Sequence, residues 1–586
     1  MRTTAPRDVV RALVLALSFG TRAVLDDPVW LAIQAVRRAP ARVRRGVVRL
    51  LLTARDPSAR RALGLYLDGA PGDAARTVAA VLRAPGSRLA HRVAAEVAVA
   101  VGSAELLDAP HDGSPHPGPA RLRALWQDGD VDAVARATAS SRAERRTLRA
   151  LRAQVRVLEP GPATGGTSTL PARTAVGDPR VLHHLTNSLP HTQSGYTLRS
   201  HAILRAQREA GLAVAATTRA AYPVTIGVLG ARGTDVVDGV RYERLLPWVL
   251  HGDPARRPAA EADLLVRAAR RFRPDVVHAT TPHTTGVAAR EAARRLAVPW
   301  VYEVRGLPEE TWAASHGSAE ARRAAEASGR YALIRAKETE LALAADHVVT
   351  LSETMRTELV GRGVPGSRIT VVPNAVPESL LQSTHPTPDA ARATLGIAAP
   401  GPVVGTVSSV VDYEGLDTVL RVVAALRADG LDATALVVGD GVARPGLLRL
   451  ADELGLGAHA LLPGRVPRAL ATTYLAALDV VLVPRRDDRV TRLVTPLKPV
   501  EAMAVGRPVV ASDLPALREA VGDAGRLVPA GEVAAWTGAV ADVLGDDDAR
   551  RGMLARGREL ATTRTWAANA ARYREVYARA LAGGGR

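Results

Sequence analysis

Residues 484–514 read PRRDDRVTRLVTPLKPVEAMAVGRPVVASDL, and this stretch decides the predicted fold. The apolar runs DVVLV just before it and PVVAS near its end are typical of buried strands. Between them, Thr495 can cap a helix, Pro496 suits the first helical position and Gly506 can end the helix. The stretch therefore predicts a strand, a helix over about residues 496–505 and a second strand, which is the unit of a parallel α/β sheet.

Short apolar runs alternate with helical patterns over residues 180–564, with an interruption near 385–400. The predicted strands begin at residues 181, 275, 299, 346 and 369 before the interruption and at 403, 435, 460, 479, 508 and 525 after it. Two such arrays predict two doubly wound parallel sheets, in a first domain over 180–385 and a second over 400–564. Ligands of such sheets bind at the carboxyl ends of the strands, so the cleft between the domains is the expected site.

The helix expected near residue 498 carries the chemistry. Lys498 and Glu501 lie three residues apart, on one face of its first turns. A helix N-terminus offers free N–H groups and a positive dipole end to an anion, and a lysine adds a point charge for phosphate. A carboxylate one turn further suits the hydroxyls of a ribose. We interpret the pair as a holder for a nucleoside diphosphate; the alternative is an ordinary capped helix with a surface ion pair.

Composition favours the diphosphate interpretation. The 586 residues include 77 Lys+Arg and 59 Asp+Glu, a formal charge of +18, and arginine supplies nearly all of the basic residues. Lys337 and Lys498 are the only lysines, so a lysine beside Arg485, Arg489 and Arg492 is informative. The chain has no cysteine, which excludes disulfides, thiolate metal sites and a cysteine nucleophile. Aromatic residues make up only 3% and the arginines are scattered, so we expect no nucleic-acid partner.

Residues 1–159 read as a helical region, and the Pro/Gly-rich stretch 160–179 reads as a linker. Within the helical region, the segments that begin at Ala62 and Arg123 look alike, because each reads as a helix, an Asp-Gly turn and a helix. Residues 1–61 contain 13 Arg and 4 Asp, so their charge is 13 − 4 = +9. The segment 43–52 interleaves Arg44, Arg45 and Arg49 with valine and leucine. Such a basic amphipathic helix can lie on an anionic membrane surface, whereas a solvated arginine-rich face is the simpler explanation.

No run of about 18 apolar residues occurs, so the sequence predicts no membrane-spanning helix. The apolar run 12–17 follows two arginines, as in a signal peptide, but Arg11 interrupts it and no A-x-A site follows. We therefore expect a cytoplasmic protein, with the inner face of the membrane as an additional place of contact.

From about residue 181 to 582 the chain resembles a retaining glycosyltransferase of family 4, whose fold is called GT-B. The run PLKPVEAMAVGRPVVAS from residue 496 resembles the donor-site signature of that family. Further landmarks follow in the family's order: HTQSGYTLRSH at 191, PDVVHATTP at 274, YEVRG at 302, AADHVVTLSETM at 344, VVPNAV at 371, VVGDG at 437 and LLPGRVP at 461. The resemblance implies two Rossmann-like α/β domains, preceded here by an all-α region, and a last helix, 565–586, that crosses back to the first, acceptor-side domain.

The resemblance also implies roles for particular residues. His278 and Lys498 would be catalytic, and Asn374 would lie at the domain junction. On the acceptor side and the first loop, the implied residues are Gly195, Tyr196 and Arg305. The implied donor-binding residues are Glu501, Arg485, Gly439, Gly441, Arg465, Val466 and Thr495.

The chain departs from the family pattern in its charged residues. Most members carry two glutamates eight residues apart; Glu501 is the second, and Leu493 replaces the first. Ser409 and Glu414 stand where many members have an arginine and a lysine. A subgroup with PLKP and EGLD motifs shows both changes, which implies that Lys498 neutralises the diphosphate there.

A second departure concerns histidine. The family's H-x-H reads His278, Ala279, Thr280 here, so the second histidine is missing, and His283 is a candidate to replace it. The junction motif reads PNAVP, with Pro377 in place of an acidic residue. These losses keep a catalytically degenerate scaffold open as an alternative function.

The expected reaction moves a sugar from a UDP-, GDP- or ADP-sugar to a glycan or lipid-linked acceptor, with retention of the anomeric configuration. Its barrier is charge separation, which preset cations and N–H dipoles can lower, so no metal or other cofactor is expected. A sugar-nucleotide epimerase on the same fold is a further alternative. A nicotinamide-dependent enzyme needs G-x-G-x-x-G after its first strand, and residues 185–200 contain a single glycine.

Overall fold

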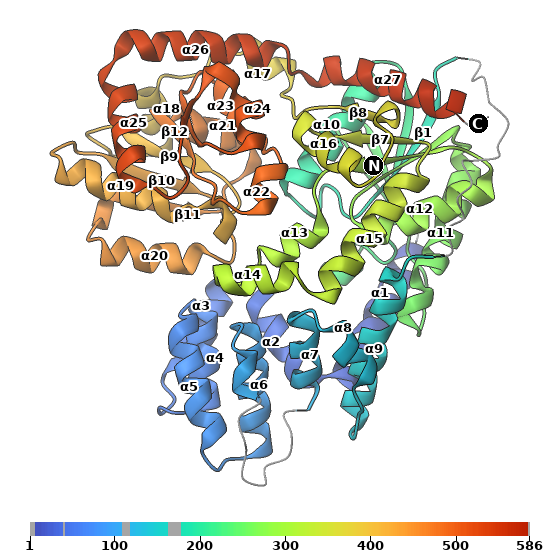
Figure 1. Cartoon of the computed structure of the whole chain (residues 1–586). Coiled ribbons are helices and arrows are strands. Elements are labelled where there is room, and N and C mark those ends of the chain that lie inside the picture. Colours follow the sequence, from blue (N-terminus) through green and yellow to red (C-terminus); the bar gives the residue numbers. More distant parts are fainter. Residues whose placement is uncertain (1–5, 39–40, 108–117, 162–176, 584–586) are drawn as a thin grey trace.

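A computed structural model describes residues 6–38, 41–107, 118–161 and 177–583. They form an all-helical N-terminal region and two parallel α/β domains, which confirms the predicted fold class (Figure 1). Most of the linker predicted over 160–179 lies outside the described residues. Among the described helices, none is long and apolar enough to cross a membrane.

The N-terminal region consists of short amphipathic helices whose starts are set by caps. Ser58 and Ser87 each accept a hydrogen bond from a backbone N–H of the first turn, and Ser141 with Glu144 forms a capping box. The helices are α1 (Pro6–Asp26), α2 (Pro28–Arg38), α3 (Ala41–Leu52), α4 (Ala59–Leu67), α5 (Pro71–Arg83), α6 (Arg88–Ala100), α7 (Pro119–Gln127), α8 (Val131–Arg136) and α9 (Arg142–Leu158).

Two Asp-Gly turns of this region contact different α/β domains. The turn between α4 and α5 meets the second domain, where Arg449 Nη1 donates to the Asp68 carbonyl at 2.9 Å. The turn between α7 and α8 meets the first domain, where the Arg330 backbone N–H donates to the Gly129 carbonyl at 3.0 Å. Arg330 also lies between the rings of Trp126 and Trp312, 4.4 and 4.5 Å from their centroids. In Figure 1 most N-terminal helices accordingly lie beneath both α/β domains.

The first domain is an eight-stranded sheet in the order β3-β4-β2-β1-β5-β6-β7-β8, parallel except for the β3–β4 pair. Its strands are β1 (Arg180–Leu185), β2 (Ala213–Thr218), β3 (Thr234–Val237), β4 (Val240–Arg244), β5 (Val276–Thr280), β6 (Trp300–Val304), β7 (His347–Thr350) and β8 (Ile369–Val371). Its helices are α10 (Gly195–Glu209), α11 (Arg257–Phe272), α12 (His283–Leu296), α13 (Pro308–Ala313), α14 (Ala319–Glu326), α15 (Gly329–Ala344) and α16 (Glu353–Gly361). Strands β5 to β7 are fully buried because helices cover both faces of the sheet.

The second domain is a six-stranded parallel sheet in the order β11-β10-β9-β12-β13-β14. Its strands are β9 (Val403–Val407), β10 (Thr434–Val438), β11 (Ala460–Gly464), β12 (Val480–Val483), β13 (Val509–Ser512) and β14 (Arg526–Val528). Its helices, with two that precede the sheet, are α17 (Glu378–Gln382), α18 (Pro388–Leu395), α19 (Asp417–Ala428), α20 (Arg444–Glu453), α21 (Arg468–Ala476), α22 (Arg489–Leu493), α23 (Lys498–Ala504), α24 (Pro515–Val521), α25 (Val533–Gly545) and α26 (Asp547–Thr562).

The last helix, α27 (Trp566–Gly583), leaves the second domain and lies against the first (Figure 1). Tyr573 and Tyr577 on α27 are fully buried there, in a cluster with residues of β1, β5 and α10. Tyr577 accepts a hydrogen bond from Gln207 of α10 at 2.8 Å, and the Tyr573 hydroxyl lies 3.0 Å from Glu303 of β6. The two α/β domains are thus joined by a crossing helix.

Candidate active site

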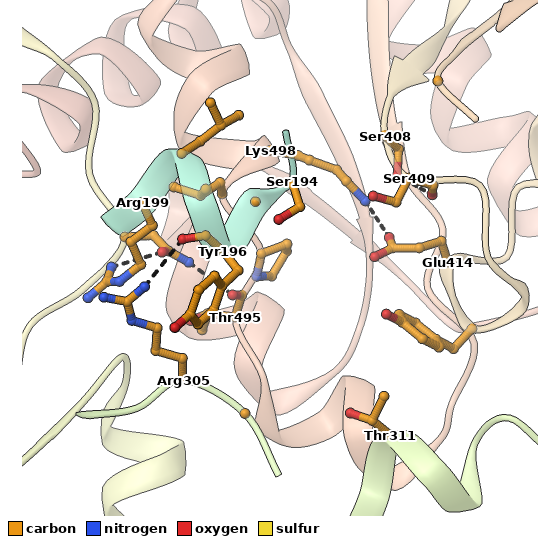
Figure 2. Close-up of a pocket in the computed structure, with 18 of the residues that line it drawn as sticks. Ser194, Tyr196, Arg199, Arg305, Thr311, Ser408, Ser409, Glu414, Thr495 and Lys498 are labelled. Carbon is orange, nitrogen blue, oxygen red and sulfur yellow. Dashed lines mark hydrogen bonds and ion pairs between the residues drawn. The ribbon is translucent and has the colours of Figure 1, made fainter. Parts of the chain in front are cut away.

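A cleft of about 890 Å³ lies between the two α/β domains, at the carboxyl ends of their strands. Figure 2 shows residues from both walls of this cleft. The predicted site residues that line it are Gly195, Tyr196, Arg305, Asn374, Gly439, Arg465, Val466, Arg485, Thr495, Lys498 and Glu501. The structure therefore brings together most residues that the sequence singled out, but His278 and Gly441 do not line the cleft.

Two cations and one carboxylate form a charged group in the second-domain wall of the cleft. Arg485 donates to Glu414 from Nη2 at 2.9 Å, and Lys498 Nζ forms a short ion pair with the same carboxylate (Figure 2). Burial by itself would raise the pKa of Glu414, but Arg485 and Lys498 hold it at about 2. With Glu414 ionised, and with both bases protonated, the group carries one net positive charge. Sequence reasoning noted Glu414 only as a departure from the family and missed its contacts, which bring together two strand-end loops.

Burial makes Lys498 responsive to its neighbours. Desolvation lowers the pKa of Lys498, and the Glu414 carboxylate partly opposes that effect. One helical turn later, burial raises the pKa of Glu501, whereas Lys498 and Arg468 lower it. Within the described residues no hydrogen bond to the Glu501 carboxylate is formed, so this acceptor is available to a ligand in the cleft.

The start of helix α23 differs from the prediction. The helix begins at Lys498 with Leu497 at the capping position, and Pro499 rather than Pro496 lies in its first turn. Thr495 does not cap the helix; its hydroxyl is buried without a partner at the cleft wall, and its carbonyl accepts a hydrogen bond from Asn374 Nδ2 at 2.9 Å. The capping prediction was wrong because α23 begins at Lys498, so Thr495 lies two residues before the capping position.

Of the three arginines before α23, only Arg485 lines the cleft. Arg489 instead contacts the first domain, with Nε 2.6 Å from Glu310 and Nη2 3.0 Å from Glu358. Arg492 pairs with nearby Asp487 at the surface. Arg489 therefore links the two domains across the cleft margin.

His278, which the resemblance implies to be catalytic, is part of the core in this structure and does not line the cleft. The side chain is fully buried on β5, where Nδ1 lies 2.9 Å from the Tyr577 hydroxyl and Nε2 lies 3.1 Å from Glu303. Its ring stacks on that of His183 at 4.5 Å, and burial lowers the pKa of both histidines. Helix α27 thus covers His278 inside β5, whereas Thr281 and Pro282 just after the strand line the cleft.

The other H-x-H position and its candidate substitute also point away from catalysis. Thr280 is fully buried and forms a short hydrogen bond with the Tyr196 hydroxyl. His283 lies at the start of α12, where it pairs with Glu338 at 3.2 Å. Neither residue lines the cleft.

Arginines of the first domain form the opposite wall. Arg199 and Arg305 both bind the fully buried Glu303, with nitrogen–oxygen distances of 3.0 Å. Arg305 also lies 5.1 Å from the centroid of the Tyr196 ring (Figure 2). Arg199 was missed by sequence reasoning, although its place on the first helix of a βα unit gave a signal.

Glycines allow the loops at the strand ends of the second domain to approach each other closely. Gly439 has a φ of +139°, and a Cβ there would collide with the Ser408 carbonyl. Gly441 likewise has no room for a Cβ beside the Val410 carbonyl. Gly441, predicted to bind the donor, packs against Val410 and does not line the cleft. Among the described residues no group of three His, Asp or Glu side chains is placed to hold a metal ion.

Comparison with known proteins agrees with this geometry. Residues 194–375 match the family model of the "Glycosyl transferase 4-like domain", and residues 401–546 match that of "Glycosyl transferases group 1". The two α/β domains form a GT-B glycosyltransferase module of family 4. The matched residues of this module include both walls of the cleft.

Relatives of the glycosyltransferase module cover only part of this chain. A D-inositol 3-phosphate glycosyltransferase of Nocardia farcinica is 35% identical over 256 residues, which are 42% of this chain and 55% of that protein. The chain thus spans about half the length of the curated relatives it matches.

Solved structures share the fold of the module. Sucrose-phosphate synthase from Thermosynechococcus elongatus superposes with a TM-score of 0.55 at 20% identity, covering 68% of this chain and 98% of that chain. The catalytic domain of starch synthase IV from Arabidopsis thaliana, bound to ADP and acarbose, gives a TM-score of 0.52 at 14% identity, covering 69% and 100%. At these identities the likeness concerns the fold alone.

Proposed function

We propose that the protein transfers a sugar from a nucleoside-diphosphate sugar to a glycan or lipid-linked acceptor, with retention of the anomeric configuration and without a metal. The observation that carries this proposal is a pair of cations, the buried Arg485 and the partly buried Lys498, beside the free carboxylate of Glu501 in the interdomain cleft. Cations at that place suit a diphosphate, and a carboxylate one turn away suits a ribose.

We infer that the donor binds with its diphosphate beside Arg485 and Lys498 and its ribose beside Glu501. When the bond between the anomeric carbon and the diphosphate oxygen breaks, the oxygen keeps the electron pair and negative charge grows there. Lys498 and Arg485 are fixed before the reaction, so they stabilise this charge without having to reorganise. The acceptor oxygen then bonds to the same face of the sugar, and its proton passes to the departing diphosphate. This arrangement supports a reaction in which side chains do the electrostatic work of a metal.

Glu414 keeps the two cations together before the donor arrives. Without it, Arg485 and Lys498 would be two like charges in a buried site, a state that burial disfavours. The donor diphosphate brings further negative charge, which the group's net positive charge and Arg465 at the margin can balance. The base and sugar of the donor are matters for experiment, and ADP bound to the starch synthase neighbour supports the nucleoside diphosphate class.

The site favours an active transferase over the two alternatives. A degenerate scaffold would not need a free Glu501 beside two cations, and an epimerase would consume its donor without an acceptor. Purified protein should therefore be screened with UDP-, GDP- and ADP-sugars by thermal shift, because a bound donor raises the melting temperature. Nucleotide release should then be measured with and without an oligosaccharide or lipid-linked acceptor.

The expected result is a stabilising donor whose turnover rises on addition of acceptor. Stabilisation without any turnover would favour the scaffold. Turnover that is unchanged by acceptor, with epimerised sugar as product, would favour the epimerase.

A further inference from the structure

Helix α1 has two apolar faces, of which only one is used for packing. Ala12 and Leu15 are fully buried against Ala221, Val224 and Leu246 of the first α/β domain. The opposite face carries the exposed side chains Val10, Leu13, Val14, Leu17 and Val24. These positions follow helical spacing and form one stripe along the helix. A helix that packs on one side normally presents polar residues on the other, so this stripe calls for a partner.

Neighbouring segments extend the apolar stripe. Trp248 and Val249 are half exposed, and the Arg11 guanidinium lies 5.2 Å from the centroid of the Trp248 ring. The short helical turn Val224–Ile226, which contacts α1, adds the exposed Ile226. We call the exposed stripe together with Trp248, Val249 and Ile226 the α1 surface. Single exposed apolar residues are common, but five exposed apolar side chains on one stripe of a helix mark an interaction site.

The charges beside the α1 surface identify its partner. By helical spacing, Arg7, Arg11 and Arg22 all lie along one edge of the stripe. Arg7 is exposed and Arg11 lies over Trp248, whereas Arg22 Nη1 donates to the Leu250 carbonyl at 3.1 Å. The acidic residues of α1 face the protein instead: Asp8 lies against Gly233, and Asp26 lies 3.7 Å from Arg146. An apolar stripe edged only by arginines is complementary to a surface with an apolar interior and anionic head groups.

We propose that the α1 surface docks the protein on an anionic lipid bilayer, with α1 lying in the plane of the interface. In this arrangement Leu13, Leu17 and Trp248 enter the acyl boundary, while Arg7 and Arg11 meet lipid phosphates. This place differs from the segment 43–52 that the sequence suggested. In α3 the exposed large apolar side chains are Val43 and Leu50 alone. The docking surface lies outside the cleft, so its test does not depend on the proposed reaction.

Vesicle binding of the full chain tests the proposal. The probes are vesicles of phosphatidylcholine alone and of equal parts phosphatidylcholine and phosphatidylglycerol, with co-sedimentation as the readout. Leu17 is 70% exposed, so Leu17→Asp should leave the fold intact. Leu89→Asp on α6, where the leucine is 63% exposed, is the matched control, and Leu50→Asp probes α3. Trp248→Ser is a second variant on the α1 surface.

We expect binding to the mixed vesicles that weakens with added salt, and little binding to phosphatidylcholine alone. Leu17→Asp and Trp248→Ser should each weaken it, the former about tenfold or more, because a leucine leaves the acyl boundary and an anion enters. Leu50→Asp and Leu89→Asp should bind like wild type. The proposal is overturned if wild type does not bind, if Leu17→Asp binds fully, or if only Leu50→Asp loses binding. It is also overturned if light scattering shows a dimer that Leu17→Asp converts to a monomer, since the surface would then join two copies.

Discussion

Lys498 is the residue whose replacement should affect the reaction most directly. Lys498→Ala removes a charge-assisted contact to the diphosphate, worth about 1.5–3 kcal/mol. At about 1.36 kcal/mol per decade this is roughly a ten- to hundredfold loss, and it should be larger in kcat than in donor affinity because charge grows as the bond breaks. Lys498→Arg should also lose turnover, since the fork of arginine does not fit a site already shared with Arg485 and Glu414.

Lys337→Arg provides the control, because it changes the only other lysine, which pairs with Glu340 away from the cleft. Steady-state kinetics with the donor found by thermal shift would check these outcomes. If both Lys498 variants matched wild type in kcat and in donor affinity, the diphosphate site would have to lie elsewhere.

The effect of Glu414 on Lys498 should appear in the pH dependence of activity. In the proposed reaction Lys498 acts in its protonated form, so we expect activity to fall as the pH rises through its pKa. Burial lowers that pKa and Glu414 opposes the effect, so Glu414→Gln should lower the pKa further. The alkaline limb of the kcat/KM profile should therefore move to lower pH in Glu414→Gln. An alkaline limb that stays in place would show that Glu414 does not control the charge of Lys498.

At the scale of elements, the crossing of α27 depends on neutral histidines. His183 and His278 are fully buried beneath Tyr577, and desolvation lowers the pKa of each below 6.5. The unfolded chain therefore binds more protons than the native one once the pH falls below about 6.5, so the free energy of unfolding decreases with falling pH.

Each such histidine contributes up to about 1.4 kcal/mol per pH unit in this window. Chemical denaturation between pH 7.5 and 5.5 would measure the slope, in which His201 and His347 also take part. His278→Gln should show a shallower slope than wild type, whereas replacement of His91, which is not in the core, should leave it unchanged. A slope that His278→Gln does not alter would contradict the assignment.

Elements were more predictable than the contacts between them. The strand positions followed from runs such as those of β12 and β13, because strands buried on both faces must be continuously apolar. The residues around Lys498 could be placed at the cleft because ligands of parallel sheets bind at the carboxyl ends of the strands. His278 could not be placed correctly, because its partner Tyr577 is 299 residues away and no local pattern reports such a contact. The contacts of Arg489 could not be predicted either, since its partners Glu310 and Glu358 belong to the other domain.

At the scale of the whole molecule, the two Asp-Gly turns of the helical region should each secure one α/β domain. Gly69 and Gly129 both have positive φ, and a Cβ would collide with Pro445 in one case and with Ser328 in the other. Gly102 also has a positive φ but has open space around it, so Gly102→Ala carries the backbone strain alone, about 1–2 kcal/mol. Gly69→Ala and Gly129→Ala should lose more stability than this control.

Hydrogen exchange would separate the two contacts. Gly69→Ala should increase exchange in α20, and Gly129→Ala in α13 to α15, because each turn then leaves its domain. Gly102→Ala should change neither segment. Equal exchange in all three variants would mean that the turns touch the α/β domains without holding them.

The contacts of the helical region with both domains have a mechanical consequence. In a transferase of two domains alone, the domains could rotate about a single hinge. Here the helical region, the first domain and the second domain touch pairwise, through Gly129, Gly69 and Arg489. Because each of the three parts contacts the other two, none of these contacts can change its geometry without a change in the others. Opening the cleft between the two α/β domains therefore requires at least one of these contacts to break, in addition to a change at the crossing helix α27.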